Sequence, residues 1–134
     1  MSASTAPLLA PAGDNVGAWM SALLAAVDAG DTPRFLSFLT DDATFRFANH
    51  PAAVGSAEVG AAVSAFLGSI GGVRHEIDHA WALAGHAVCQ GVVSYTRMDG
   101  STLTVPFANV FALHDGRIRD YRIYVDASAL YAPA

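Results

Sequence analysis

The chain has 134 residues, of which 53% are hydrophobic and 14% are charged, and its formal net charge is −5. This length suffices for one globular domain with its own core. All seven basic residues are arginines, and most are scattered, so binding to nucleic acid or an anionic membrane surface is not expected. The single cysteine, Cys89, excludes an internal disulfide and favours a reducing, cytoplasmic setting.

Residues 1–13 are rich in Ala, Pro and Ser and carry no basic residue before their short apolar stretch. This composition is typical of a flexible tail and not of a secretory signal. No apolar run approaches the roughly 18 residues that a membrane-spanning helix requires. No repeat or linker divides the remainder, so we expect residues 14–134 to form a single domain.

Helical periodicity predicts three helices in the first half of the chain. The first spans 14–29, where apolar residues recur every three or four positions, and Gly30 is suited to end it. A short second helix begins after Thr32, a suitable N-cap. A strand at 44–48 and a loop then lead to a third helix from about 56 to 70.

The second half of the chain changes to a two-residue period. Four strands are predicted, at 73–83, 86–98, 102–113 and 117–125, and glycines typical of hairpin turns separate them. Helices followed by an antiparallel meander indicate an α+β fold. Strands this long are expected to curl, so we expect a cone-shaped sheet around a pocket closed by the three helices.

Four short phrases carry a resemblance to a known family: Asp-Ala-Gly-Asp at 28–31, Asp-Asp-Ala-Thr at 41–44, Asp-Gly-Arg-Ile at 115–118 and Tyr-Arg-Ile-Tyr-Val-Asp at 121–126. In this order they resemble the nuclear transport factor 2-like superfamily, and within it the SnoaL-like and ketosteroid-isomerase-like branch. The resemblance covers roughly residues 16–131. It implies a cystatin-like roll that forms a homodimer through the outer face of its sheet.

The resemblance also excludes two reactions. The catalytic positions of limonene-epoxide hydrolases correspond to Phe45, Phe47, Gln90, Val92 and Ile123. The base and oxyanion-binding positions of ketosteroid isomerases correspond to Phe47, Leu23 and Ala108. None of these side chains can perform the reaction of the relative, so neither activity is expected from the known residues.

A third set of relatives fits better. Scytalone dehydratase and lindane dehydrochlorinase use an Asp–His pair, which the resemblance places on Asp28 and His75. The additional tyrosines of the dehydratase correspond to Val27 and Phe47, so its substrate is not implied. Asp28 also falls in the last helical turn, where a carboxylate opposes the helix dipole. It is either a solvated loop residue or a partner that orients His75.

Strict alternation along 73–83 places His75, His79 and Trp81 on one apolar face. A buried imidazole needs hydrogen-bond partners, so His75 is either a core histidine bonded to a backbone carbonyl or a general base. The two histidines lie about 13 Å apart along a strand and cannot share a metal ion.

Asn109 interrupts an apolar stripe on the predicted strand 102–113. It is suited to a hydrogen bond in the pocket or across a subunit interface. Periodicity turns Asn109 inward, whereas the isomerase match turns Ala108 inward, so both orientations stay open.

We therefore expect a cofactor-independent enzyme without a metal ion, in which His75 removes a proton and Asp28 orients the imidazole. The expected reaction is an elimination, isomerisation or cyclisation of a small hydrophobic molecule. Two alternatives stay open: a non-catalytic module that binds an apolar ligand, and a scaffold whose interior is filled by its own side chains. The expected binding wall consists of Trp19, Leu23, Phe45, Phe47, His79, Gln90, Val92, Asn109 and Ile123.

Overall fold

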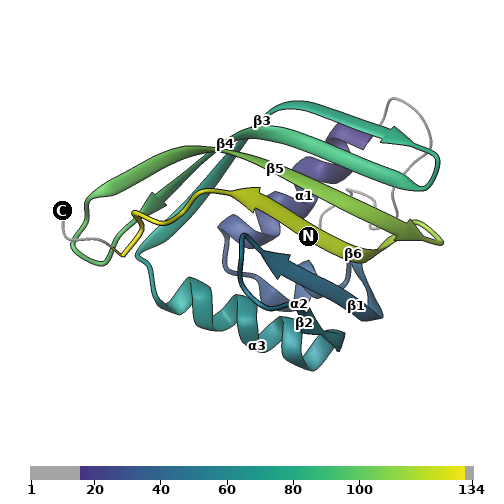
Figure 1. Cartoon of the computed structure of the whole chain (residues 1–134), viewed down its shortest axis with the longest axis horizontal. Helices are drawn as coiled ribbons and strands as arrows, with labels where there is room; N and C mark the ends of the chain where they lie inside the picture. The colour runs from purple at the N-terminus through teal and green to yellow at the C-terminus, as the bar shows by residue number, and fades with distance from the viewer. Residues whose placement is uncertain (1–15, 132–134) are drawn as a thin grey trace, which may run out of the picture.

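The computed structural model describes residues 16–131, so the predicted tail at 1–13 lies outside the described residues. Its elements are α1 (Val16–Asp28), α2 (Thr32–Leu36), β1 (Leu39–Phe47), β2 (Ala53–Val54), α3 (Gly55–Gly68), β3 (Gly72–Leu83), β4 (His86–Thr96), β5 (Thr102–His114) and β6 (Arg117–Val125) (Figure 1). Helices in the first half and long strands in the second half confirm the predicted α+β class.

The six strands form one curved, unclosed sheet in the order β2-β1-β6-β5-β4-β3. Neighbouring strands are antiparallel, except that β1 and β6 run parallel. β1 begins at Leu39 and not at 44 as predicted, with a register shift between Leu39 and Thr44. The polar residues in this early part of β1 resemble a turn, which is why the sequence pattern located only its second half.

The ends of the first two helices follow from local chemistry. Gly30 has a φ of 70°, a left-handed conformation that glycine adopts without strain and that ends α1. The Asp31 carboxylate accepts a hydrogen bond from the backbone N–H of Arg34 at 3.1 Å and so caps α2. Thr32, the predicted cap, is instead the first residue of α2.

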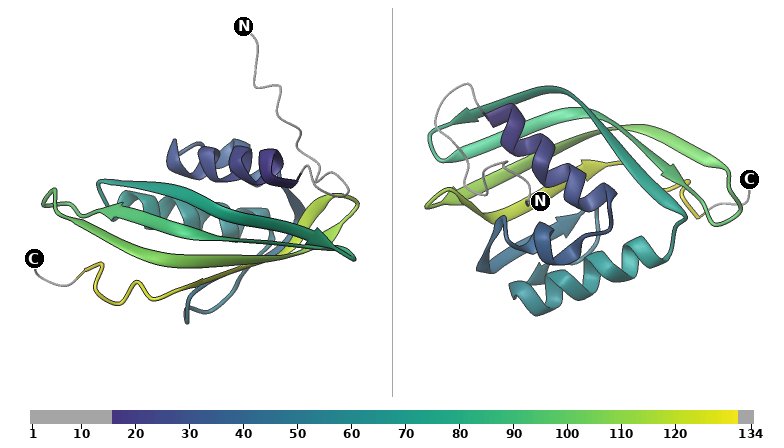
Figure 2. Two further views of the ribbon diagram at one scale, coloured as in Figure 1. Left: turned by 90° about the horizontal axis from the view of Figure 1, so that it is seen from above. Right: turned by 180° about the vertical axis from the view of Figure 1, so that it is seen from behind.

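The helices lie on one side of the sheet (Figure 2). α1 crosses the concave face and packs on β3, whereas α3 lies along the edge formed by β1 and β2. Trp19 of α1 is fully buried, and its ring contacts Phe38 and Phe111 at centroid distances of 6.2 and 6.1 Å. The apolar side of α1 is therefore filled by direct helix–sheet packing.

A β-bulge interrupts the pairing of β3 with β4 between Ile77 and His79. Gly91 lies opposite, so close to the bulged strand that an added Cβ would approach the Glu76 carbonyl oxygen to 1.9 Å. The extra residue reverses the alternation of side chains in the rest of β3. The inward positions after the bulge are Ala80 and Ala82. The prediction that one face carries His75, His79 and Trp81 is therefore wrong.

Candidate active site

A cavity of about 420 Å³ lies between the concave face of the sheet and α3. Apolar side chains from all three helices and all six strands form most of its wall. Polar groups enter it from His50, Ser69, His75, Tyr95, Tyr121 and Tyr131. A largely apolar cavity of this size with a few polar groups is typical of a site for one small molecule.

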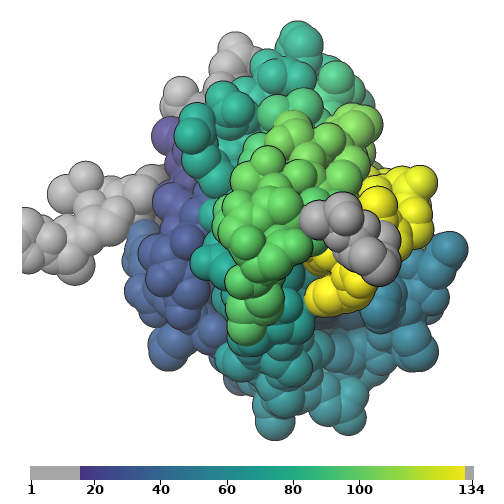
Figure 3. Space-filling view, turned by 90° about the vertical axis from the view of Figure 1, so that its left-hand side faces the viewer, coloured from purple at the N-terminus to yellow at the C-terminus, as the bar shows by residue number. Residues whose placement is uncertain are grey.

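The C-terminal segment borders this cavity. The guanidinium of Arg97 donates hydrogen bonds to the backbone carbonyls of Ala129 and Leu130, at 3.0 and 3.1 Å. The hydroxyls of Tyr131 and Ser69 lie 2.7 Å apart, which connects the segment to the end of α3. Figure 3 views the molecule from this end, with the segment in yellow beside the 96–102 hairpin in green and α3 in teal below.

The structure brings Asp28 and His75 into direct contact. The Asp28 Oδ1 lies 2.6 Å from the imidazole Nδ1 of His75, and Oδ2 accepts a hydrogen bond from the His75 backbone N–H at 3.0 Å. The His75 side chain is 13% exposed and that of Asp28 is 24% exposed. Asp28 is thus a partly buried partner of His75 and not a solvated loop residue.

Two hydrogen bonds to one carboxylate fix the imidazole in position. Because the ionised carboxylate only accepts hydrogen bonds, the contact requires a proton on Nδ1 of His75. In the neutral ring, Nε2 then carries a lone pair. The edge of the ring also packs against Phe107 at a centroid distance of 5.2 Å. His75 lines the cavity, whereas Asp28 lies behind it.

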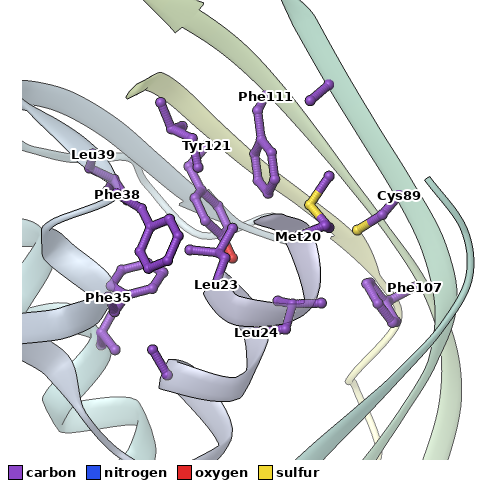
Figure 4. Close-up of a cluster of buried hydrophobic side chains, with 14 of the residues drawn as sticks. Met20, Leu23, Leu24, Phe35, Phe38, Leu39, Cys89, Phe107, Phe111 and Tyr121 are labelled. Atoms are coloured by element: carbon purple, nitrogen blue, oxygen red, sulfur yellow. The ribbon is translucent and has the colours of Figure 1, made fainter. Parts of the chain in front are cut away.

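Three residues predicted to form the binding wall line the cavity: Phe45, Phe47 and Ile123. Trp19 and Leu23 do not. Both are fully buried where α1 packs on the sheet, and Figure 4 shows Leu23 among Met20, Phe38 and Tyr121. Their place in the binding wall is corrected to a place in the packed core, because helix–sheet packing leaves no space beside them.

Three further predicted binding residues lie on the outer face of the sheet. His79 follows the bulge and is exposed, with its ring stacked on Trp81 at 5.7 Å. Gln90 is exposed and Val92 half-buried, because alternation along β4 turns Cys89 and Val93 inward. His79, Gln90 and Val92 are therefore corrected from cavity positions to outer-face positions.

Asn109 faces the interior, as periodicity predicted, and is 1% exposed. It is paired across the sheet with Cys89 and Ile123, while Ala108 lies on the opposite face. The Asn109 Oδ1 is buried without a hydrogen-bond partner among residues 16–131. Asn109 does not line the cavity, so its expected place in the binding wall is also corrected.

Two buried tyrosines that were not predicted as site residues, Tyr95 and Tyr121, also line the cavity. Burial raises the pKa of Tyr95 to about 12, with a smaller contribution from Tyr131. Burial raises the pKa of Tyr121 well above its usual value. Both phenols therefore remain neutral hydrogen-bond donors at physiological pH. Their alternation with apolar inward residues was the available sequence signal, but it equally suits a core tyrosine.

Cys89, unlike the two tyrosines, is not a candidate site residue. Burial raises its pKa to about 12, an effect that a hydrogen bond from the backbone of Asn109 partly offsets. A thiol with a raised pKa remains protonated and unreactive at neutral pH. Cys89 therefore behaves as a small buried apolar residue.

Within the described part of the chain, no three His, Cys, Asp or Glu side chains are grouped closely enough to hold a metal ion. The chemistry available at the cavity wall is that of an oriented imidazole, phenols and a serine hydroxyl.

Across residues 16–131, none of the helices combines the length and apolar character that a membrane crossing requires.

A curved sheet with helices on its concave side and a hollow between them define the nuclear transport factor 2-like and ketosteroid-isomerase-like class of fold. The model of the SnoaL-like domain matches residues 20–121, and the chain belongs to this family. No curated protein matches the sequence significantly.

Solved structures share the fold at low sequence identity. TerC, co-crystallised with polyporic acid, is 19% identical with a TM-score of 0.75, and the match covers 82% of this chain and 90% of TerC. A ketosteroid-isomerase-like protein from Catenulispora acidiphila, in complex with trimethylamine, is 17% identical with a TM-score of 0.77, covering 84% and 88%. A protein from a Jannaschia species, provisionally named a SnoaL-like polyketide cyclase, is 16% identical with a TM-score of 0.73, covering 86% and 90%.

Proposed function

We propose that this SnoaL-like protein is a cofactor-independent lyase, isomerase or cyclase for a small hydrophobic molecule. One observation carries the proposal: the imidazole of His75 lies on the wall of an apolar cavity and is held by Asp28 through Nδ1 at 2.6 Å. The provisional naming of structural neighbours as polyketide cyclases supports the same class of chemistry.

In the proposed reaction, Nε2 of His75 takes a proton from a carbon beside an activating group. Asp28 keeps the proton of the neutral ring on Nδ1 and stabilises the imidazolium that forms. The imidazolium then returns the proton: to carbon in an isomerisation, or to a leaving group in an elimination. In a cyclisation the carbanion attacks a second carbonyl carbon of the same molecule, and the proton goes to the alkoxide oxygen that forms there. The pair thus acts as both base and acid, and the overall reaction consumes no co-reactant.

The aromatic side chains in the cavity wall favour a ligand that contains a ring. Phe45, Phe47 and Phe66 present aromatic surfaces to the cavity, with the rings of Phe47 and Phe66 5.0 Å apart. Aromatic walls favour flat apolar ligands through stacking and through burial of apolar area. We therefore propose a compact cyclic substrate and not an extended charged one.

Exchange of carbon-bound hydrogen in D₂O tests the proposal without knowledge of the substrate, because all three reaction types begin by removing such a proton. The probe is 2-indanone, a small cyclic ketone, followed by NMR. The wild-type protein should accelerate exchange, and His75→Gln should lower the acceleration by about 100-fold or more. His114→Gln is the matched control, since it changes an exposed histidine that does not line the cavity.

Equal exchange rates with the wild-type protein and with His75→Gln would contradict the proposal. The non-catalytic alternative is favoured by the predominance of apolar groups in the wall. It predicts that 2-indanone binds but that neither protein accelerates exchange.

We further propose that a second copy of the chain covers the outer face of the sheet, as the family resemblance implies. This face carries Trp81 and Tyr124, which are 49% and 54% exposed. Sedimentation of the wild-type protein should give a dimer, and Trp81→Glu should shift it toward the monomer. A wild-type monomer at high protein concentration would contradict this part of the proposal.

A further inference from the structure

Tyr121 is held rigidly at the boundary between the packed core and the cavity. It points inward from β6 and is 2% exposed. Its ring contacts Phe35, Phe45 and Phe111 at centroid distances of 5.4, 5.0 and 4.4 Å. Three aromatic neighbours leave the ring little freedom, so its hydroxyl occupies a fixed position.

This hydroxyl has no hydrogen-bond partner among residues 16–131. In the same part of the chain, the fully sealed polar side-chain atoms without a partner belong to Arg34 and Asn109. The Tyr121 oxygen is not among them and therefore keeps some access to the cavity that its side chain lines. Figure 4 shows the ring extending from β6 toward α1, with the oxygen at its inner end.

Tyr121 and His75 line the same cavity, so a single bound molecule can contact both side chains. Burial is the main reason why the pKa of Tyr121 is raised, and the neighbouring Cys89, Asp28 and Tyr95 groups raise it further. The raised pKa keeps the phenol protonated at neutral pH. A neutral phenol in this region can donate one hydrogen bond, and an oxygen atom of a bound ligand is the natural acceptor.

We infer that Tyr121 is the hydrogen-bond donor that holds a carbonyl oxygen of the substrate, which defines the substrate class as small cyclic ketones with an acidic C–H beside the carbonyl. This inference rests on the proposed role of His75 as the base. It adds the acceptor oxygen and its position to a site that otherwise specifies only an apolar ligand.

The proton-transfer step then balances within the site. Nε2 of His75 takes the proton from the carbon beside the carbonyl, and the electron pair of the broken C–H bond forms a C=C bond. The π pair of the carbonyl moves onto its oxygen, and the hydrogen bond from Tyr121 stabilises the negative charge there. The imidazolium of His75 later returns the proton to carbon, which restores the neutral base.

Tyr121 does not occupy a position at which the resembling relatives carry a tyrosine. Those positions correspond to Leu23, Val27, Phe45 and Phe47, none of which has a hydroxyl. Tyr121 reaches the cavity from β6, on a different element. The proposed donor in this chain thus lies on a different element from the one that the family resemblance implies.

A matched pair of probes tests the inference. 2-Indanone has a carbonyl oxygen that only accepts hydrogen bonds, and indane has the same ring system without that oxygen. Titration followed by ligand-observed NMR should show that Tyr121→Phe weakens 2-indanone binding by about five- to tenfold. Indane binding should not change, because the variant keeps the aromatic ring. Tyr124→Phe removes a hydroxyl on the outer side of the same strand and keeps the aromatic ring that we propose faces a second copy, so it should affect neither probe.

The two proposals fail in different ways. If both probes bind the wild-type protein and Tyr121→Phe changes neither affinity, or both equally, the inference about Tyr121 is overturned while the role of His75 stands. If neither probe binds, the apolar site itself is disproved, and the inference falls with it. A lower rate of deuterium exchange into 2-indanone with Tyr121→Phe, with Tyr124→Phe unaffected, supports the donor role in the reaction.

Discussion

The interior of the protein has two halves that contain similar side chains and behave differently. In the packed half, Trp19, Phe38 and Phe111 interlock beneath α1 and leave no space. In the hollow half, aromatic side chains such as Phe45 and Phe66 surround a cavity of about 420 Å³. The difference comes from helix placement, because α1 lies on the sheet whereas α3 packs along its β1–β2 edge. Aromatic content alone therefore does not distinguish a core from a binding site.

The largest expected effect comes from equivalent truncations in the two halves. Trp19→Ala should lower the free energy of unfolding by about 3–5 kcal/mol, because it opens a void in a filled region. Phe66→Ala should cost only about 1–2 kcal/mol, because its half-buried ring already borders empty space. Urea unfolding measures both. Equal losses would show that the two halves are packed alike and would remove the contrast.

Gly91 lies between the halves, opposite the bulge in β3. Gly91→Ala should destabilise the fold by about 1–3 kcal/mol, since the new methyl group would meet the Glu76 carbonyl oxygen at 1.9 Å and force the strands apart. Gly68→Ala is the matched control, because a Cβ there meets nothing within 4 Å and alanine favours the helix. Thermal unfolding of both variants distinguishes a local clash from a general loss of glycine. An unchanged midpoint for Gly91→Ala would contradict the close approach.

Asp28 links α1 of the packed half to β3 at the edge of the hollow half. Asp28→Asn keeps the shape but removes the negative charge from two hydrogen bonds, so we expect a loss of about 1–2 kcal/mol in unfolding free energy. Asp31→Asn, at the exposed cap of α2, should change stability by less than about 0.5 kcal/mol, because asparagine also caps helices well. Similar losses in the two variants would mean that the contact with His75 contributes nothing specific.

The smallest expected effect concerns Asp120, which joins β6 to β1 through a hydrogen bond with Thr44 and does not line the cavity. Burial raises its pKa, but hydrogen bonds from Thr44 and Arg122 outweigh that effect and leave the pKa below its usual value. Because the pKa is depressed in the folded state, this stabilisation is present above about pH 4 and is lost as the pH falls through the folded value. Asp120→Asn should therefore reduce stability at pH 6 by about 0.5 kcal/mol and reduce it less at pH 3.

Chemical unfolding at these two pH values, for the wild-type protein and for Asp120→Asn, measures the difference. A variant that loses the same free energy at both would show that the carboxylate charge is not responsible. The packed half serves as the comparison. Its buried side chains are almost all uncharged, so truncating one of them should lower the free energy of unfolding equally at both pH values.

Much of the architecture could be predicted because it depends on local patterns. The apolar spacing of α1 and the glycines between the long strands required no tertiary information. The contact between Asp28 and His75 was predicted from family resemblance, and the structure places the two side chains 2.6 Å apart. Strict alternation failed for His79, because a bulge that depends on the close approach of Gly91 is not visible in the strand's own sequence.

The cavity wall was less accessible to sequence reasoning. Trp19 and Leu23 have the composition of a binding wall, and only the position of α1 on the sheet assigns them to the core. His50 and Ser69 line the cavity from segments outside the helices and strands, where no periodicity indicates a direction. Tyr121 follows a register irregularity between β5 and β6, so its inward orientation also depends on tertiary structure.

The position of the proton on the His75 imidazole tests the proposed Asp28–His75 mechanism most directly. Long-range ¹H–¹⁵N NMR of His75, with and without 2-indanone, reports which ring nitrogen carries the proton and which one responds to a ligand. The account predicts a proton on Nδ1, which faces Asp28, and an Nε2 resonance that shifts when 2-indanone binds. A proton on Nε2, or an Nε2 resonance that stays constant while 2-indanone occupies the cavity, would contradict it.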